Sequence, residues 1–200
     1  MTPLLKGYAL IAAVMITTQS AIAGQYVVEL SEPLDSLVLK QMTDNSIALE
    51  ETLSAVEILS AGAGSYAVFS AADEAAVESF LDAFSFRVEK ISEVLFINSP
   101  AVSGGQPAGE VPRAGHDVFV IERPIPGVGF LGLEKKQLIS QNSNTAITKL
   151  GEVIEWDHSY LTSDGTYCVY RADSPETLRE HGALAGAPIG KITRVLQESH

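Results

Sequence analysis

The feature that most constrains this chain is an internal repeat, because two segments of similar sequence follow one another in the same order. The differences in spacing between the matches fall in predicted loops. The matched stretches are 27–29 with 120–122, 45–46 with 142–143, 65–69 with 166–170, and 90–94 with 191–195. Chance similarity of apolar strands is the alternative explanation, but four ordered matches favour duplication. The chain is therefore expected to contain two copies of one small unit.

A stretch rich in glycine, proline and serine separates the two copies. Residues 98–115 have the composition of a linker, with many turn formers and few apolar residues. We therefore predict a degenerate first copy at 24–97, a linker at 98–115 and a second copy at 116–200.

Each copy is predicted to have the order β-α-β-β-α-β. In the second copy, β-rich runs occupy 117–122, 153–161, 166–171 and 189–196. Its helices are predicted from Ile139, Ser143, Ala146 and Leu150 at helical spacing, and from the Ser174-Pro175 start signal. The first copy has apolar residues at helical spacing at Val38, Met42, Leu49 and Leu53, and again at Val77, Phe80 and Phe84. The expected fold class is α+β, with two tandem ferredoxin-like sandwiches built on antiparallel sheets.

Both faces of the predicted strands are apolar. In the second copy, Val118 and Val120 alternate with Phe119 and Ile121. Helices of a ferredoxin-like unit cover one sheet face, so the other should be polar if it meets water. We therefore expect the two copies to dock sheet face to sheet face as an intrachain pseudo-dimer. A homodimer of chains would satisfy the same pattern.

The first 23 residues have the layout of a secretory signal peptide. Lys6 provides the positive charge, 9–16 is an apolar run, and Ala21 and Ala23 form an A-x-A cleavage site. The apolar run is shorter than the roughly 20 residues of a transmembrane helix. The mature protein is therefore expected to be periplasmic or secreted, with no membrane attachment after cleavage.

Charge and cysteine content exclude several functional classes. The formal net charge is −12, which argues against nucleic-acid binding through a general phosphate-neutralising surface. The charge is compatible with attracting cations but identifies no ligand. Cys168 is the only cysteine, so neither an intrachain disulfide nor an iron–sulfur cluster can form.

Comparison of the two copies identifies candidate metal ligands. The second copy has His158, Cys168 and His181 where the first has, in order, a small residue, Ala67 and Phe80. Glu122 is shared, since it matches Glu29. Imidazole, thiolate and carboxylate together suit zinc, nickel or copper better than calcium or magnesium. We therefore predict a divalent transition metal, with zinc, nickel and copper left open, and Glu122, His158, Cys168 and His181 as candidate ligands.

Each candidate also has an ordinary structural interpretation. His181 on a helix stripe is compatible with a hydrogen-bonded core residue, and His158 with the end of an apolar strand face. Cys168 in a strand rich in valine and tyrosine can be an inert small hydrophobe. Glu122 can be a strand-end charge. No diagnostic metal-ligand spacing selects between these readings and the metal.

Six segments of the second copy form a recognisable ordered set: 120–123, 141–144, 156–160, 166–170, 176–181 and 191–193. Together they resemble the domain-of-unknown-function 4242 family, which includes a nickel-binding protein. The resemblance covers about 116–200, while the first copy shares it only through its likeness to the second. It implies a ferredoxin-like fold that self-associates and can bind divalent metal.

The leading expectation is an exported, nickel-like metal-binding protein with its site in the second copy. That site requires His158 and His181 to approach one another across the sheet–helix layer. A second hypothesis is a small-molecule enzyme or binding protein with a cavity between the two copies, in which Glu122 orients His158 as a general base. A third is a non-catalytic structural or interaction module, because fold alone does not fix function.

Overall fold

A computed structural model describes most of the chain. The described residues are 24–35, 38, 40–41, 44 and 53–199. The predicted signal peptide, 1–23, lies outside them, as do Met42 and Leu49 of the predicted first helix. Leu53, also assigned to that helix, instead begins a strand and pairs with Ala71.

The described elements fall into an N-terminal half, a connecting segment and a C-terminal half. The N-terminal half contains β1 (Gly24–Leu30), β2 (Leu53–Ala61), β3 (Gly64–Ala71), α2 (Glu74–Ala83) and β4 (Val88–Glu93). The connecting segment contains β5 (Phe96–Asn98) and α3 (Pro100–Ser103). The C-terminal half contains β6 (Asp117–Arg123), η1 (Val128–Phe130), α4 (Leu133–Leu150), η2 (Gly151–Val153), β7 (Ile154–Leu161), β8 (Thr166–Ala172), α5 (Pro175–Ala185) and β9 (Ile192–Ser199). The C-terminal half thus has the predicted β-α-β-β-α-β order, although its last strand begins later than expected.

The described strands form one antiparallel sheet of nine strands. Their order is β4-β1-β3-β2-β9-β6-β8-β7-β5. Within each half, the four main strands follow the same order: fourth, first, third, second. The protein is therefore an α+β protein with antiparallel, ferredoxin-like strand order, as the sequence predicts.

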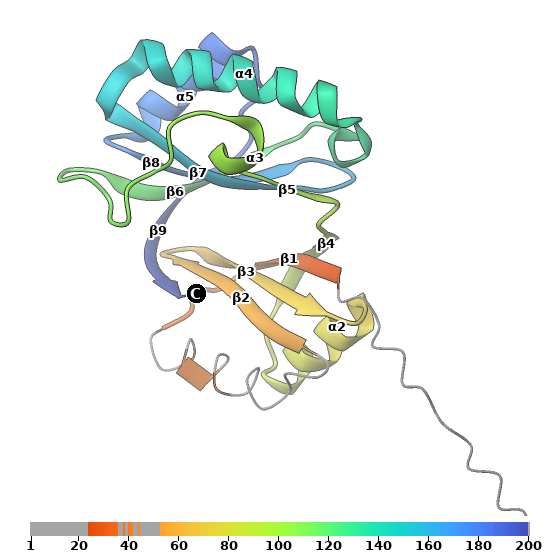
Figure 1. Cartoon of the computed structure of the whole chain (residues 1–200). Helices are drawn as coiled ribbons and strands as arrows, with labels where there is room; N and C mark the ends of the chain where they lie inside the picture. The colour runs from red at the N-terminus through yellow and green to blue at the C-terminus, as the bar shows by residue number, and fades with distance from the viewer. Residues whose placement is uncertain (1–23, 36–37, 39, 42–43, 45–52, 200) are drawn as a thin grey trace, which may run out of the picture.

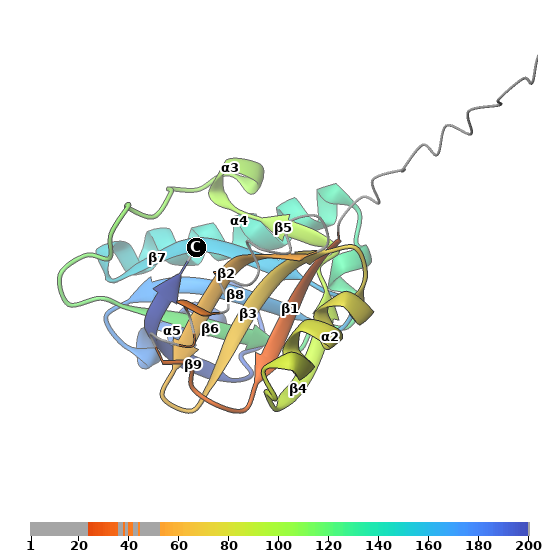
Figure 2. The ribbon, with the colours of Figure 1, turned by 90° about the horizontal axis from the view of Figure 1, so that it is seen from below.

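Strand β9 joins the two halves. Its first part pairs with β6, with Phe119 opposite Arg194. Its second part pairs with β2, with Ile58 opposite Ser199. Figure 2 shows β9 beside β2 at the margin of the N-terminal strands. One strand is thus shared between both halves of the sheet.

Helices lie outside and strands inside (Figure 1). Helices α4 and α5 cover the outer face of the C-terminal strands, and α2 covers the outer face of the N-terminal ones. A buried cluster lies between the two inner faces: Val27, Leu59, Tyr66, Val68, Val118, Val120, Tyr160, Tyr167, Val169 and Val195. Both faces of the C-terminal strands are therefore buried, which accounts for their apolar pattern. In the described part of the chain, no helix is long and apolar enough to cross a membrane.

Helix α5 shows how local sequence fixes an element near the candidate site. The Ser174 hydroxyl accepts a hydrogen bond from the Thr177 backbone amide, and Pro175 occupies the first turn. Gly186 ends the helix with φ of 65°, in the left-handed region that favours glycine. The helix therefore begins and ends where its sequence signals lie.

The segment predicted as a linker is partly structured. Strand β5 pairs with β7, with Ile97 opposite Tyr160. The Asn98 side-chain amide donates a hydrogen bond of 2.7 Å to the Ser140 hydroxyl on α4. The start of this segment therefore belongs to the C-terminal half.

Candidate functional site

The structure does not bring the four predicted ligands together. His158 and Glu122 lie on the strand face between the two halves, whereas Cys168 and His181 lie on the helix side. A β-bulge between Trp156 and His158 places these two residues on opposite faces of β7. His158 therefore cannot approach His181 as the metal hypothesis requires. Among the described residues, no group of three or more His, Cys, Asp or Glu side chains could hold a metal ion.

His158 instead forms a part-buried ion pair between the halves. Its Nε2 lies 3.0 Å from the Oε2 of Glu57 on β2, and the Tyr160 hydroxyl donates to the same oxygen at 2.9 Å. Burial alone would lower the pKa of His158, but hydrogen bonds to Asp157 and Glu57 outweigh it and raise the pKa to about 9. His158 is therefore charged at neutral pH and links β7 to β2. Glu57, an acidic residue within an apolar strand, was the sequence signal for this contact.

Glu122 also bonds across the junction, but not to His158. It accepts a hydrogen bond of 2.5 Å from the Tyr66 hydroxyl, and Lys191 Nζ lies 3.4 Å from its carboxylate. Reciprocally, the Tyr167 hydroxyl donates to Glu29 at 2.6 Å. The predicted pair of His158 as base and Glu122 as orienting partner is therefore not formed.

A polar recess of about 320 Å³ does lie at the junction of the halves. Glu29, Glu122, Lys90 and Asp164 are among its lining residues, but His158 is not. The expected cavity between the copies therefore lacks the imidazole that the enzyme hypothesis placed in it.

His181 is fully buried and hydrogen-bonded on both ring nitrogens. Nδ1 lies 3.3 Å from Nη2 of Arg123, and Nε2 lies 3.0 Å from the Ser143 hydroxyl. Because a guanidinium can only donate, Nδ1 must accept and Nε2 carries the proton. Burial and the nearby Arg123 charge lower the pKa of His181 to about 4. His181 is therefore a neutral imidazole that orients Arg123.

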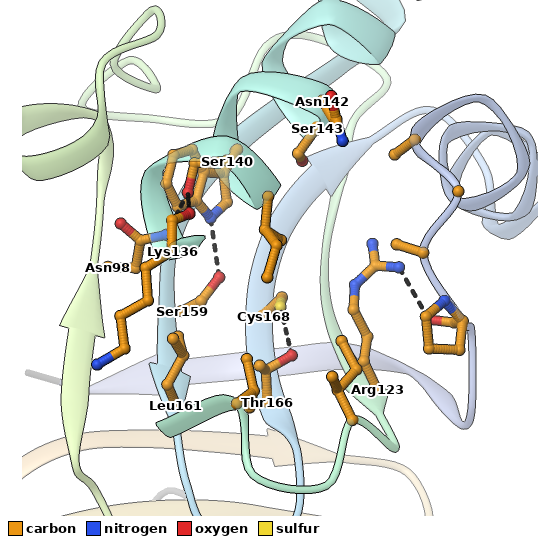
Figure 3. Close-up of a pocket in the computed structure, with 18 of the residues that line it drawn as sticks. Asn98, Arg123, Lys136, Ser140, Asn142, Ser143, Ser159, Leu161, Thr166 and Cys168 are labelled. Carbon is orange, nitrogen blue, oxygen red and sulfur yellow. Dashed lines mark hydrogen bonds between the residues drawn. The ribbon is translucent and has the colours of Figure 1, made fainter. Parts of the chain in front are cut away.

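A second cavity lies within the C-terminal half, between strands β6 to β8 and helix α4 (Figure 3). Its volume is about 240 Å³. The apolar lining residues include Ile125, Val128, Ile139, Trp156, Leu161 and Pro188. The polar ones include Arg123, Lys136, Ser140, Ser143, Ser159, Thr166, Cys168 and Tyr170. Of the four predicted ligands, Cys168 alone lines it, and its Sγ lies 3.0 Å from Thr166 Oγ1.

Two buried cations on this cavity were missed by the sequence reasoning. Arg123 is 5% exposed and Lys136 is 8% exposed. Alignment of Glu122 with Glu29 places Arg123 opposite Leu30, which is itself buried. Comparison of the two copies could therefore have indicated that Arg123 is buried, because it occupies the position of a core leucine. Lys136 lies on α4, which also carries charged residues on its exposed side, so nothing in the sequence distinguishes this buried lysine from the exposed ones.

Comparisons with known proteins find one family model similar to part of the chain and solved structures similar over most of it. Residues 119–195 match the family model described as "Nickel responsive protein SCO4226-like". No curated protein matches the chain. Similar solved structures include a chlorite dismutase variant bound to cyanide from Candidatus Nitrospira defluvii, with 10% identity, coverage of 90% of this chain and 92% of that chain, and a TM-score of 0.49. An anthrone oxidase-like protein gives 12% identity, 88% and 92% coverage, and a TM-score of 0.44.

Proposed function

We propose that the C-terminal half of this protein binds a small organic molecule in the cavity beneath α4. The observation that carries this proposal is a cavity of about 240 Å³ on which apolar and polar side chains converge. Ligand sites are typically concave and mostly apolar, with a few polar groups that fix orientation. Since a cavity of about 150 Å³ is enough for benzene, a single-ring compound with a polar substituent fits this volume.

The polar groups of the cavity are held in place by neighbours. The indole nitrogen of Trp156 donates to the Ser159 hydroxyl at 3.0 Å, and Asn98 donates to the Ser140 hydroxyl at 2.7 Å. Side chains that are already ordered lose little conformational entropy when a ligand binds. The wall is therefore suited to recognition of a ligand.

An NMR titration tests this function. Benzoate, benzamide and benzyl alcohol are each expected to shift the backbone amide signals of residues lining the cavity, at concentrations up to millimolar. Ile139→Trp, at a partly exposed lining position, should abolish the shifts. Leu138→Trp, at the adjacent exposed residue that does not line the cavity, is the matched control. Absence of any shift with all three compounds, or shifts unchanged by Ile139→Trp, would contradict the proposal.

A second candidate function is divalent metal binding, which the family match over 119–195 supports loosely. The candidate ligands remain Glu122, His158, Cys168 and His181. These residues lie on two faces of the sheet, so a site that uses all four would require rearrangement of the strands. A site between two protein chains could instead combine some of them with ligands from the second chain.

Calorimetric titration with nickel and zinc tests the metal candidate. The tag-free protein is compared with the His158→Ala/His181→Ala variant, and with His158→Ala alone in case loss of the buried imidazole prevents folding. Tight stoichiometric binding that either variant loses would support the metal function. Absent binding, or binding unchanged in both variants, would reject these histidines as ligands.

We also propose that the two halves are copies of one ferredoxin-like unit, docked as an intrachain pseudo-dimer. The shared strand order supports this proposal. So do the reciprocal contacts of Tyr66 with Glu122 and of Tyr167 with Glu29, since a two-fold arrangement pairs equivalent residues in both directions. Sedimentation equilibrium should therefore give a monomer, whereas a stable dimer would favour a second chain.

The N-terminal pattern supports export of the protein to the periplasm or the outside of the cell. Expression of the full chain should yield a mature form that begins at Gly24 in the extracytoplasmic fraction. N-terminal sequencing of that fraction tests this, and an intact Met1 in the cytoplasmic fraction would contradict it.

A further inference from the structure

Arg123 is a buried cation with hydrogen-bond partners but no carboxylate partner among the described residues. Its Nη1 donates to the Pro188 carbonyl at 3.0 Å and its Nη2 to His181 at 3.3 Å. The Cys168 thiol and the Tyr170 ring complete its surroundings. Among the described residues, no acidic side chain forms an ion pair with it. A buried charge without a counter-charge is costly, so this arrangement requires an explanation.

Lys136 places a second positive charge on the wall of the same cavity. Its ammonium lies 4.3 Å from the centre of the Phe96 ring, a cation–π contact. In the described part of the chain it has no ion-pair partner. Figure 3 shows Lys136 and Arg123 coming from opposite sides of the cavity. Both cations therefore raise the potential inside it.

The absence of acidic lining residues contrasts with the rest of the protein. The chain has 25 acidic and 13 basic residues. None of the described residues that line this cavity is Asp or Glu, although two are basic. Charges in a partly enclosed site interact more strongly than charges on the open surface, because less water screens them. The cavity is therefore a positive region in an otherwise acidic molecule.

Resting on the proposed ligand-binding function, we infer that the cavity binds an organic carboxylate, with its anionic group at Arg123 and its apolar body against Val128, Ile139 and Trp156. A guanidinium matches the planar geometry of a carboxylate and can donate two parallel hydrogen bonds to it. The cavity volume of about 240 Å³ limits the apolar body of the ligand to about one ring, since a protein cavity of about 150 Å³ is enough for benzene. The ligand carboxylate would supply a counter-charge that no Asp or Glu of the described residues provides to Arg123.

His181 has a positioning role in this site. It accepts a hydrogen bond from Arg123 and is itself fixed by Ser143, so it limits rotation of the guanidinium. A neutral imidazole performs this role without a second charge beside Arg123. Substitution by Gln, which can also accept from Arg123, should keep part of the carboxylate affinity, while Leu should lose it.

Three compounds of nearly the same shape test the ligand class: benzoate is an anion, benzamide is neutral and benzamidinium is a cation. Binding constants come from the NMR titration with the unmodified protein. Benzoate is expected to bind about ten- to a hundredfold more tightly than benzamide, because charge-assisted hydrogen bonds replace neutral ones. Benzamidinium should bind more weakly than either.

The outcomes separate the ligand class from ligand binding itself. Equal affinity for benzoate and benzamide overturns the carboxylate inference but leaves the binding function standing, whereas no binding of any compound removes both. Phenylphosphonate binding more tightly than benzoate would replace carboxylate by phosphonate or phosphate. Arg123→Gln should abolish the preference for benzoate and Arg123→Lys should keep part of it, while Arg179→Gln, on the exposed side of α5, is the matched control. If the Arg123 variants do not fold, the relative affinities of benzoate, benzamide and benzamidinium for the unmodified protein still test the carboxylate inference.

Discussion

At the scale of single residues, one buried cation sets the protonation of its neighbour. Arg123 donates to His181, and its charge adds to the effect of burial in lowering the pKa of that imidazole. The histidine that sequence reasoning considered as a ligand is thereby a neutral acceptor. Both ring nitrogens of His181 have hydrogen-bond partners within the protein, Arg123 and Ser143, so neither nitrogen requires a metal ion as a partner.

The pKa of His181 tests this relation directly. In the unmodified protein it should be about 4, with the proton on Nε2 in the neutral form. Arg123→Gln removes the nearby charge, so the pKa should rise, while burial still keeps it below the ordinary value. Histidine ring ¹⁵N signals followed over pH measure both the pKa and the tautomer. A pKa unchanged by Arg123→Gln would mean that burial alone lowers it.

At the scale of elements, capping decides where helices begin. Ser174 caps α5 through its hydroxyl, whereas Ser99, also extended and also followed by proline, caps α3 without a side-chain hydrogen bond. Ser174→Ala should lower the free energy of unfolding by about 1 kcal/mol. Ser99→Ala is the matched control and should change it little. Urea denaturation measures both, and equal effects would contradict the capping argument.

The sequence predicted the C-terminal elements because local signals determine them. The Ser174-Pro175 start and the turn at 163–165 fixed α5 and the β7–β8 hairpin without tertiary information. The candidate site depended instead on which strand face each residue occupies. The bulge after Trp156 changes that face for His158, and no local signal in the sequence marks it.

The cavity cations were hidden for a different reason. A buried Arg and a surface Arg have the same local pattern, since burial depends on the helices packed above the strand. For Arg123 the aligned Leu30 of the first copy offered indirect information, whereas for Lys136 only the structure reveals the contact with Phe96.

At the scale of the whole molecule, reciprocal tyrosine–glutamate bonds join the halves. Tyr66→Phe leaves Glu122, and Tyr167→Phe leaves Glu29, without its donated hydroxyl. Each change should cost about 1–3 kcal/mol, because a part-buried carboxylate loses a hydrogen bond. Tyr26→Phe, at a buried tyrosine outside this junction, is the control. Urea denaturation measures all three, and the junction has little energetic weight if the control is affected as strongly.

The pKa shifts of His158 and His181 have opposite signs and therefore predict opposite pH dependences of the unfolding free energy. The pKa of His158 is higher in the folded protein, about 9, so its stabilisation is complete below pH 6.5 and lost as pH rises towards 9. The pKa of His181 is lower when folded, about 4, so stability is lost as pH falls from 6.5 towards 4. Each contributes at most about 3 kcal/mol.

Urea denaturation between pH 5 and 9.5 tests the alkaline limb. His158→Gln should flatten the fall in unfolding free energy above about pH 6.5, since it removes the titrating group. Its acid limb should stay as in the unmodified protein, which serves as the internal control. An unaltered alkaline limb would show that the bond to Glu57 does not link protonation to folding.

The sharing of β9 sets an order for assembly during synthesis. Strand β2 leaves the ribosome long before β9, although the two pair in the finished sheet. Until β9 arrives, one edge of the N-terminal strands has unpaired backbone groups, and such edges can recruit strands of other chains. The edge of β2 thus stays unpaired until β9 has been synthesised. A chaperone that covers this edge would act in that interval.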